Sequence, residues 1–435
     1  MARGPRHPSL ESWLDWQQTL HPRAMDLGLE RVGRVLARTG WTGPGAPVIT
    51  IGGTNGKGSC VAFTAAMLRA ADHRVATFTS PHLVDYRERI RIDGVPVSAA
   101  SLVAAFERIA DALGPDTITF FEFNTLAALL VFETARPDAL VLEVGMGGRL
   151  DAVNLVDPDV AVIVSVGLDH VEWLGPDVES IGREKAGILR PGRPAVVGTP
   201  TPPQSVLDAA ARLGADLRLR GRDFEAAVRD GDWDYRDRDG ELAALPRPTL
   251  AGDVQVGNAA TSLAAVRALA ARLPVTRAAI EQGLATASLP GRFQRIRDPR
   301  GYEWVLDVAH NEDSARTLAA TLARYPVPGR TLAVCGMLAD KDVPAVVSSL
   351  RDAVDAWHAA STDGPRGLSA AELAARAAPA GLTMRPVGPV ADALEAVGAS
   401  AQPGDRVVVF GSFHTVGPAL AQLAATGRVP AAGWL

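Results

Sequence analysis

Short apolar runs alternate with amphipathic stretches along the first half of the chain. The runs are rich in β-branched residues, which is typical of strands that are buried on both faces of a parallel sheet. They cover residues 47–51, 74–79, 139–145, 160–166 and 194–198. Apolar residues at helical spacing cover residues 10–38, with a turn at His21 and Pro22, and residues 59–69, 99–113 and 125–135. This alternation predicts a doubly wound α/β fold, in which ligands bind at the carboxyl ends of the parallel strands.

The second half of the chain predicts an insertion, a junction and a smaller domain. Residues 223–250 are polar, and the alternation in DWDYRD favours a β-hairpin. An alanine-rich helix over residues 255–271, entered through Asn258, comes before the Pro-Gly segment of residues 288–294. Four further apolar runs, at residues 303–308, 331–335, 356–360 and 406–410, predict a smaller, Rossmann-like α/β unit. We therefore expect two domains: residues 1–290, with a helical lead, and residues 291–435.

Composition limits the possible functions. A chain of 435 residues is too long for one compact core. The net charge of −5 and the lack of a basic block give little support to nucleic-acid binding. No apolar run approaches the ~20 residues of a membrane span, and the first residues lack an apolar signal core. Cys60 and Cys335 lie far apart and have no metal-site spacing. We expect a cytoplasmic monomer whose partners are small molecules.

A glycine-rich turn joins the first predicted strand to the next helix. The sequence GGTNGKGS has glycines at positions 52, 53, 56 and 58 around a single lysine, Lys57. Glycines let backbone N–H groups turn toward an anion, and the positive end of a helix that opens at Ser59 would add to the attraction. This is a variant of the P-loop, with Lys57 for the β/γ-phosphates and the Ser59 hydroxyl for Mg²⁺. The alternative is a strand-to-helix turn without a ligand, but packing does not explain four glycines around one lysine.

Lysine usage supports this interpretation. Of the 44 basic residues only three are lysine, namely Lys57, Lys185 and Lys341, and the others are arginine. A lysine that is kept in such a chain indicates a site that needs a compact ammonium or a reactive amine. Two alternatives remain: the three lysines survived by drift, or Lys185 is a surface residue that is salt-bridged to Glu184.

Polar residues follow successive predicted strands. Ser80, Glu143 and His170 each follow one strand of the first domain, so we expect them to converge beside the glycine-rich turn. Oxygen ligands with one histidine suit Mg²⁺ or Mn²⁺. Taken singly, Ser80 could instead be a helix cap, Glu143 a buried salt-bridge partner and His170 a core histidine. In the second domain DVAHN, GMLADKD and GSFHTV also follow strands, which predicts a second ligand-binding edge.

The motifs, in this order, resemble the Mur ligase superfamily and, within it, the bifunctional dihydrofolate synthase/folylpolyglutamate synthases. The resemblance runs from DLGLERV at Asp26 to the end of the chain. It is carried by GTNGKGS, SPHLV, TFFEFNTLAA, LEVGMGGRLDA, DHVEWLGP, GREKAGI, LPGRFQ, DVAHN, GMLADKD and GSFHTV. Where the family usually has HNP, this chain has His310, Asn311 and Glu312, which puts the geometry of that turn in question.

The resemblance implies a set of site residues. ATP would be held by Thr54, Asn55, Gly56, Lys57, Gly58, Ser59, Asn258, Arg292 and Asp307, and Mg²⁺ by Ser80, Glu143, His170 and a carbamylated Lys185. Lys57, Lys185 and His170 would be catalytic. The substrates would contact Asp26, Leu27, Gly28, Leu29, Pro81, His82, Thr119, Phe120, Phe121, Glu122, Leu150, Asp151, Ala152, His310, Ser412 and His414.

The implied activity is ATP-dependent ligation of L-glutamate to dihydropteroate and to folates through an acyl phosphate. A monofunctional folylpolyglutamate synthase and a cell-wall amino-acid ligase are alternatives within the superfamily. A regulatory P-loop NTPase is the alternative from another class. A second predicted α/β domain with its own polar edge favours a ligase, because a ligase must bind further substrates.

Overall fold

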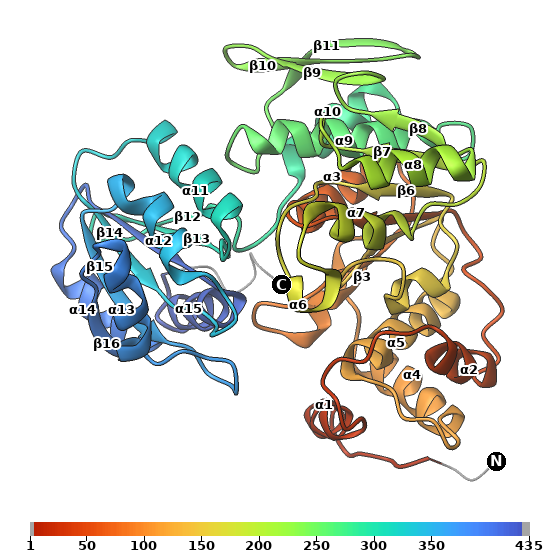
Figure 1. Cartoon of the computed structure of the whole chain (residues 1–435), viewed down its shortest axis with the longest axis horizontal. Coiled ribbons are helices and arrows are strands. Elements are labelled where there is room, and N and C mark those ends of the chain that lie inside the picture. The colour runs from red at the N-terminus through yellow and green to blue at the C-terminus, as the bar shows by residue number, and fades with distance from the viewer. Residues whose placement is uncertain (1–3, 429–435) are drawn as a thin grey trace. The chain divides into compact units, whose positions relative to one another are not determined.

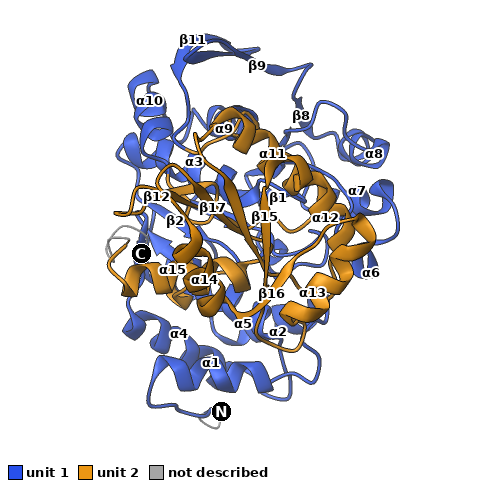
Figure 2. Cartoon of the chain, turned by 90° about the vertical axis from the view of Figure 1, so that its left-hand side faces the viewer, with its two compact units in different colours: residues 1–80, 89–249, 256–287 blue, residues 81–88, 250–255, 288–435 orange. Residues whose placement is uncertain are grey.

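The computed structural model describes residues 4–428, and the chain divides into two compact units (Figure 2). Unit 1 holds the residues up to 80 together with 89–249 and 256–287. Unit 2 holds residues 81–88, 250–255 and those from 288 onward. The predicted junction at residues 288–294 lies where the last segment of unit 2 begins. Two short segments that the predicted boundary assigns to the first domain, 81–88 and 250–255, also belong to unit 2.

Unit 1 is built on an eight-stranded sheet with the order β4-β3-β2-β5-β1-β6-β7-β8. Its parallel strands are β1 Val48–Gly52, β2 Val75–Phe78, β5 Ala139–Glu143, β6 Val160–Ile163, β7 Pro194–Val197 and β8 Asp216–Leu219. The short strands β3 Ile90–Ile92 and β4 Val95–Pro96 extend one edge in antiparallel pairing. Every residue of β1 is buried, as the apolar run predicts. The predicted doubly wound parallel sheet is confirmed.

Two helices of unit 1 start earlier than the sequence pattern predicts. The helices of this unit are α1 Leu10–Thr19, α2 Glu30–Arg38, α3 Lys57–Ala70, α4 Ala99–Ala112, α5 Phe120–Ala135, α6 Val171–Leu174, α7 Val178–Ala186, α8 Gln204–Leu213, α9 Val254–Ala268 and α10 Arg277–Thr286. Two predicted starts are wrong: α3 begins at Lys57 rather than Ser59, and α5 begins at Phe120 rather than Thr125. In α5, a capping box between Thr119 and Glu122 satisfies the first backbone N–H groups and fixes the earlier start.

The predicted hairpin insertion is a three-stranded antiparallel sheet. Its strands are β9 Phe224–Val228, β10 Asp232–Asp237 and β11 Gly240–Pro246, with β10 in the centre. Figure 1 shows this sheet at one end of unit 1 and the helices α1, α2, α4 and α5 gathered at the other end. The extra strand, β9, pairs with the edge of β10 that a two-stranded hairpin would leave unpaired.

Unit 2 is a smaller α/β unit around a six-stranded sheet with the order β12-β13-β17-β14-β15-β16. Its strands are β12 Gln294–Arg297, β13 Glu303–Asp307, β14 Thr331–Cys335, β15 Ala356–Ser361, β16 Arg385–Pro389 and β17 Arg406–Phe410, and only β12 is antiparallel. The helices are α11 Glu312–Arg324, α12 Val343–Leu350, α13 Ala370–Ala377, α14 Val390–Ser400 and α15 Phe413–Ala425. Strands β12 and β16 were not predicted from the sequence.

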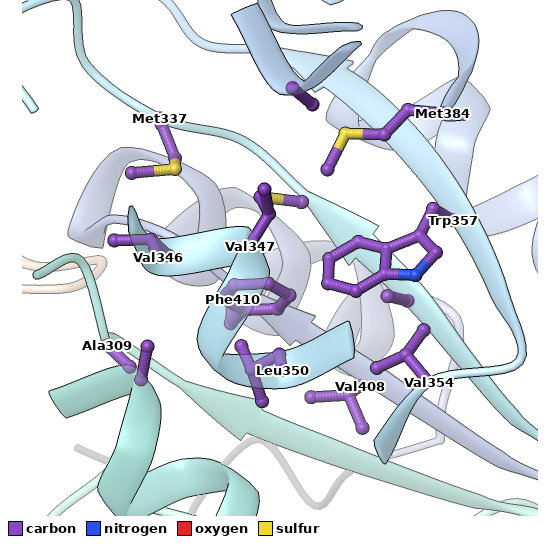
Figure 3. Packing of buried hydrophobic residues seen from close by; sticks show 14 of the residues in the cluster. Ala309, Met337, Val346, Val347, Leu350, Val354, Trp357, Met384, Val408 and Phe410 are labelled. Atoms are coloured by element: carbon purple, nitrogen blue, oxygen red, sulfur yellow. The ribbon is translucent and has the colours of Figure 1, made fainter. Parts of the chain in front are cut away.

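Packing on both faces of the second sheet holds unit 2 together. On one face, Trp357 and Phe410 pack against Val347 and Leu350 of α12, and the two rings lie with centroids 6.1 Å apart (Figure 3). A separate cluster on the other side includes residues of α14 and α15. Burial of apolar residues on both faces is what the near-continuous apolar strands predict. Over residues 4–428, the structure has no helix that is both long and apolar enough to cross a membrane.

Candidate active site

The glycine-rich turn lies at the carboxyl end of β1, in the middle of the unit 1 sheet. Gly56 caps α3 with a φ of 87°, a conformation that glycine adopts without strain. Lys57 Nζ donates to the carbonyl oxygens of Gly53, at 3.0 Å, and Thr54, at 3.2 Å. Lys57 is also the first residue of α3, so its ammonium lies over the turn at the start of a helix. Anions bind at such helix starts because backbone N–H groups and the helix dipole both favour negative charge.

Residues 164–167, which follow β6, hold the turn in place. Thr54 N donates to Ser165 O at 2.9 Å, and Asn55 N donates to Ser165 Oγ at 3.0 Å. Thr54 Oγ1 both donates to Gly167 O and accepts from Gly167 N. Ser165 was missed in the sequence because nothing in its local pattern marks it. Its role depends on the parallel pairing of β1 with β6.

Gly56 also brings a distant predicted residue to the turn. A Cβ atom at Gly56 would lie 2.8 Å from Asn258 Oδ1 and 2.9 Å from Val164 Cγ1, so only glycine fits. Asn258 is buried in α9, and Ser262 Oγ donates to its carbonyl oxygen at 2.9 Å. The structure thus places Asn258 against the glycine-rich turn, as the predicted nucleotide site requires.

Two of the predicted metal ligands lie together. Ser80 N donates to Glu143 Oε2 at 3.2 Å, and Glu143 is the buried last residue of β5. His170 differs from the prediction, because β6 ends at Ile163 and the histidine lies seven residues further along, at the cap of the short helix α6. Its φ of 52° is unusual for a residue with a side chain. The intervening loop is the one that holds Thr54 and Asn55.

The donor chemistry of these three residues fits a hard divalent cation. Ser80 and Glu143 offer oxygen atoms and His170 offers one imidazole, which Mg²⁺ and Mn²⁺ accept. Within residues 4–428, no group of three or more His, Cys, Asp or Glu side chains is arranged to hold a metal ion. A cation at this edge would therefore take some of its ligands from elsewhere, and phosphate oxygens are the obvious source.

Lys185 lies in the last turn of α7 with an exposed fraction of 3%. Burial and the nearby charge of Lys57 lower the pKa of its amine to about 7, although Asp169 and Asp151 oppose this shift. The alternative of a surface salt bridge is wrong. Glu184 pairs with Arg149 instead, through an Oε1–Nη2 distance of 2.8 Å, and over residues 4–428 no carboxylate lies within ion-pair distance of Lys185. Asp169, one residue before the predicted His170, was missed.

Asp151 is the second buried charge at this edge. Burial raises the pKa of its carboxyl to about 6, although backbone N–H groups donate to it and Lys57 lies nearby. Its Oδ2 accepts from Met146 N at 2.9 Å and its Oδ1 from Val153 N at 3.0 Å. A Cβ at Gly145 would lie 2.5 Å from the Phe121 ring and 3.1 Å from Asp151 Oδ2. Phe121 and Asp151, two predicted substrate contacts, are therefore neighbours.

The other predicted acceptor residues in unit 1 form a second group. Asp26, Leu27, Gly28 and Leu29 lie in the segment between α1 and α2, and Thr119, Phe120 and Glu122 lie at the start of α5. Arg31 joins the two segments, because its guanidinium donates to both Asp26 and Glu122. Phe120 lies under the Arg89 guanidinium, 5.6 Å from the ring centroid. Leu150 and Ala152 flank the buried Asp151.

In unit 2 the predicted residues lie at the carboxyl ends of β13 and β17. Asp307 is the last residue of β13, and its carboxylate accepts from Phe293 N and Ala309 N, both at 2.8 Å. Burial raises the pKa of Asp307, although Arg292 opposes the shift. The Arg292 guanidinium lies 5.2 Å from the centroid of the Phe413 ring.

The remaining predicted contacts in unit 2 lie at helix starts. Ser412 caps α15, and burial is the main cause of the lowered pKa of His414. His310 Nδ1 lies 2.8 Å from Val308 O. The turn without proline is well formed, because Asn311 caps α11 in a capping box with Ser314.

The SPHLV motif is divided between the units. Ser80 belongs to unit 1, whereas Pro81 and His82 belong to unit 2. Within unit 2, Leu83 packs against α15 so closely that a Cβ at Gly417 would lie 2.0 Å from Leu83 O.

Two domain families match the chain. The Mur ligase middle domain matches residues 51–266, and the glutamate ligase domain of Mur ligases matches residues 291–413. Together with the lysine-bearing turn at the carboxyl edge of the first sheet, these matches define a two-domain Mur-type ligase.

Relatives that match nearly the full length of the chain identify its branch of the Mur ligase superfamily. The Escherichia coli K12 dihydrofolate synthase/folylpolyglutamate synthase is 45% identical over 418 residues, which cover 96% of this chain and 96% of that protein. The solved structure of E. coli FolC in complex with DHPP and ADP is 44% identical, with a TM-score of 0.92 over 97% of this chain and 100% of that one. The chain therefore belongs to the dihydrofolate synthase/folylpolyglutamate synthase family.

A further solved structure shows what a similar protein binds. It is a bifunctional folylpolyglutamate synthase/dihydrofolate synthase with Mn, AMPPNP and L-glutamate bound, 43% identical to this chain. Its TM-score is 0.89, and the match covers 97% of this chain and 100% of that one. The predicted family, fold class and class of enzyme are confirmed.

Proposed function

We propose that this chain is an ATP-dependent ligase that joins L-glutamate to dihydropteroate, giving dihydrofolate, and to folates, extending a polyglutamate tail. The proposal rests on one observation: the carboxyl edge of the unit 1 sheet holds the lysine-bearing turn, the Ser80–Glu143 pair and the buried Lys185 and Asp151. The bound molecules named for the relatives, a nucleotide, a divalent metal, DHPP and L-glutamate, support it.

An amide does not form from a carboxylate and an amine in water, because oxide is a poor leaving group. In the proposed reaction the acceptor carboxylate attacks the γ-phosphorus of ATP, which gives an acyl phosphate and releases ADP. The α-amine of L-glutamate, once it has lost a proton, then attacks the acyl carbon and releases phosphate. Such phosphoryl transfer depends on positioning and on neutralising charge, and little covalent chemistry is needed from the protein.

The nucleotide would lie on the glycine-rich turn. In unit 1 its contacts would come from the turn itself and from α9, namely Thr54, Asn55, Gly56, Lys57, Gly58, Ser59 and Asn258. Arg292 and Asp307 of unit 2 would also bind the nucleotide. Lys57 places a compact positive charge at the start of α3, where charge develops on the transferred phosphoryl group. The ammonium would exchange its two carbonyl contacts, with Gly53 and Thr54, for phosphate oxygens.

The metal would be held by Ser80, Glu143, His170 and a carbamylated Lys185. Magnesium held there would neutralise negative charge on the bound phosphates. We propose the carbamate because a cationic amine beside Lys57 and a metal would be repelled, and the lowered pKa of Lys185 makes a neutral amine available to CO₂.

The acceptor would bind against Asp26, Leu27, Gly28, Leu29, Thr119, Phe120, Phe121, Glu122, Leu150, Asp151 and Ala152. Pro81, His82, His310, Ser412 and His414 would contact substrate from unit 2. We place the domain boundary at residues 290/291, so that the first domain would hold the glycine-rich turn and the acceptor-binding residues.

One assay tests the proposal against a regulatory NTPase. Phosphate release from ATP should be appreciable only when both dihydropteroate and L-glutamate are present, with one phosphate released for each glutamate incorporated. Equal hydrolysis without the two other substrates would contradict the ligase proposal and favour a switch.

A second assay separates the alternatives within the family. We propose both activities in one chain, acting as a monomer in the cytoplasm, where ATP is available. Glutamate incorporation should occur with dihydropteroate and, separately, with tetrahydrofolate. Incorporation with tetrahydrofolate alone would replace this proposal with a monofunctional folylpolyglutamate synthase. Light scattering after size exclusion tests the monomer.

A further inference from the structure

Arg31 joins the two segments of unit 1 that hold predicted acceptor-binding residues, 26–29 and 119–122. It lies in the first turn of α2, and its side chain is 21% exposed. Nη1 donates to Asp26 Oδ2 at 2.5 Å, and Nη2 donates to Glu122 Oε1 at 2.7 Å and Oε2 at 2.9 Å. Nη2 also donates to the carbonyl oxygen of Asp26 at 3.1 Å. The guanidinium thus connects Asp26 to Glu122, which lies 91 positions after Arg31 in the sequence.

The two carboxylates that Arg31 bridges differ in how many of their oxygens accept hydrogen bonds. Glu122 Oε2 accepts from Thr119 N at 2.7 Å and from Thr119 Oγ1 at 3.0 Å, so both oxygens of this buried carboxylate already have partners. In Asp26, the side chain is 29% exposed and Oδ2 takes the bond from Arg31, with His21 Nε2 at 3.4 Å. Over residues 4–428, Asp26 Oδ1 accepts no hydrogen bond, and Arg23 Nη1 lies 4.0 Å away.

Replacing Arg31 would leave a buried carboxylate without its partner. Burial by itself would lower the pKa of Arg31, but the hydrogen bonds and charges of Glu122 and Asp26 raise it, so the guanidinium stays charged. Its planar fork can meet two carboxylates at once, whereas a lysine ammonium is a single point charge. Arg31 Nε is buried without a hydrogen-bond partner, so the terminal nitrogens alone orient the group.

We propose that Arg31 is a positioning residue of the acceptor pocket: it ties the Asp26 segment to the start of α5, anchors Glu122, and leaves Asp26 Oδ1 to accept from the donor edge of the pterin ring. This inference rests on the proposed function. The pterin amino group and ring N–H are donors, which a carboxylate oxygen matches. Of these two predicted contacts, Asp26 then touches the substrate. Glu122 does not touch it and acts only through its hydrogen bonds with Arg31 and Thr119.

Steady-state kinetics of Arg31→Lys and Arg31→Met test this role, with each of the three substrates varied in turn. We expect the KM for dihydropteroate to rise at least about tenfold in Arg31→Met and less in Arg31→Lys, with the KM values for ATP and L-glutamate unchanged and kcat within about threefold. Arg34 provides the matched control, because it lies on the same helix and pairs with Asp116 at 2.6 Å but is 55% exposed. Arg34→Met should leave all three KM values unchanged.

A double variant tests whether Arg31 acts through Glu122. Arg31→Met combined with Glu122→Gln should raise the KM for dihydropteroate no more than about twofold beyond the larger single effect. Effects that multiply would overturn the proposed link, and so would a lowered thermal midpoint in Arg31→Lys with an unchanged KM for dihydropteroate. The proposed function is tested separately, because it fails if the unmodified enzyme incorporates no glutamate.

Discussion

The carboxyl edges of the two sheets both carry polar residues, but they satisfy them in different ways. At the unit 2 edge, Asp307 accepts two backbone N–H bonds, and Asn311 forms a capping box with Ser314. At the unit 1 edge, Lys185 is buried without an ion-pair partner within residues 4–428, and burial lowers the pKa of its amine to about 7. Lys341, the lysine of unit 2, lies 3.5 Å from Asp340.

This difference separates a working edge from a supporting one. Burying an uncompensated charge costs free energy, and proteins retain such groups mainly where the charge or its removal is used in chemistry. The unit 1 edge buries such a group, Lys185, so substitutions there should reduce activity far more than stability. Substitution of Asn311, the cap of α11, should do the opposite.

Lys57 should give the largest effect. Lys57→Ala removes the charge that faces the transferred phosphoryl group but little buried area, so ligation should fall about a thousandfold while the thermal midpoint stays near that of the unmodified enzyme. Lys57→Arg should fail as well, because the turn holds a compact ammonium. Near-normal turnover by the arginine variant, measured as glutamate incorporation, would contradict this assignment.

Lys185 comes next. Lys185→Ala should lose about a hundredfold in kcat if its carbamate helps to hold the metal, and a short-chain carboxylate such as formate should restore part of the activity. Lys185→Arg should remain inactive in the presence of formate, because a guanidinium does not react with CO₂ at ordinary pH. An active arginine variant would argue for a plain cation at this position.

The pH dependence of activation sharpens the same point. Carbamate forms from the neutral amine, and burial lowers the pKa of the unmodified Lys185 to about 7. The neutral fraction therefore rises as pH increases through 7, and activation by added bicarbonate should be greater at pH 8 than at pH 6. A flat response of glutamate incorporation to bicarbonate at both pH values would count against the carbamate.

Gln17 offers a test away from both edges. Its side chain is buried in α1, and neither Nε2 nor Oε1 has a hydrogen-bond partner. Removing this unpaired amide in Gln17→Leu should raise the free energy of unfolding by about 1–2 kcal/mol without changing kcat. Calorimetry measures the shift. The exposed neighbour provides the control, since Gln18→Leu should give no such increase.

Asn311 should give the smallest effect. Asn311→Ala removes the N-cap of α11 and should lower the free energy of unfolding by about 1 kcal/mol, with kcat within about threefold of the unmodified value. Asn311→Ser keeps a capping oxygen and should retain most of the stability. A large loss of activity in Asn311→Ala with unchanged stability would move this residue from the supporting group to the working group.

Local pattern predicts the strands well and the loops poorly. The buried strands of both sheets follow from apolar runs, and the glycine-rich turn follows from its composition. His170 was placed at a strand end because the sequence does not show where β6 stops, and residues 164–169 then turn back to hold Thr54 and Asn55. Strand β9 was missed because it lies within residues 223–250, a segment whose polar character and alternation indicated only a two-stranded hairpin.

The sequence could not indicate the contacts that hold the site residues, because these contacts join residues far apart in the chain. Glu184 lies next to Lys185 in the chain but pairs with Arg149, which the close packing of Gly148 against the end of α7 brings near. Ser165 and Arg31 act through partners more than 90 residues away in the sequence. The candidate residues were predictable from their motifs, whereas the contacts that hold them were not.

The way the chain is divided between the two units has a mechanical consequence. The chain crosses from one unit to the other five times, at residues 80/81, 88/89, 249/250, 255/256 and 287/288. A single proteolytic cut between residues 287 and 288 would therefore leave two segments of unit 2, residues 81–88 and 250–255, on the fragment that carries unit 1. Expression of residues 288–435 alone would omit Leu83, against which Gly417 packs, and Gly252, which packs against Thr321. Unit 2 thus depends on short segments that lie within the sequence of unit 1.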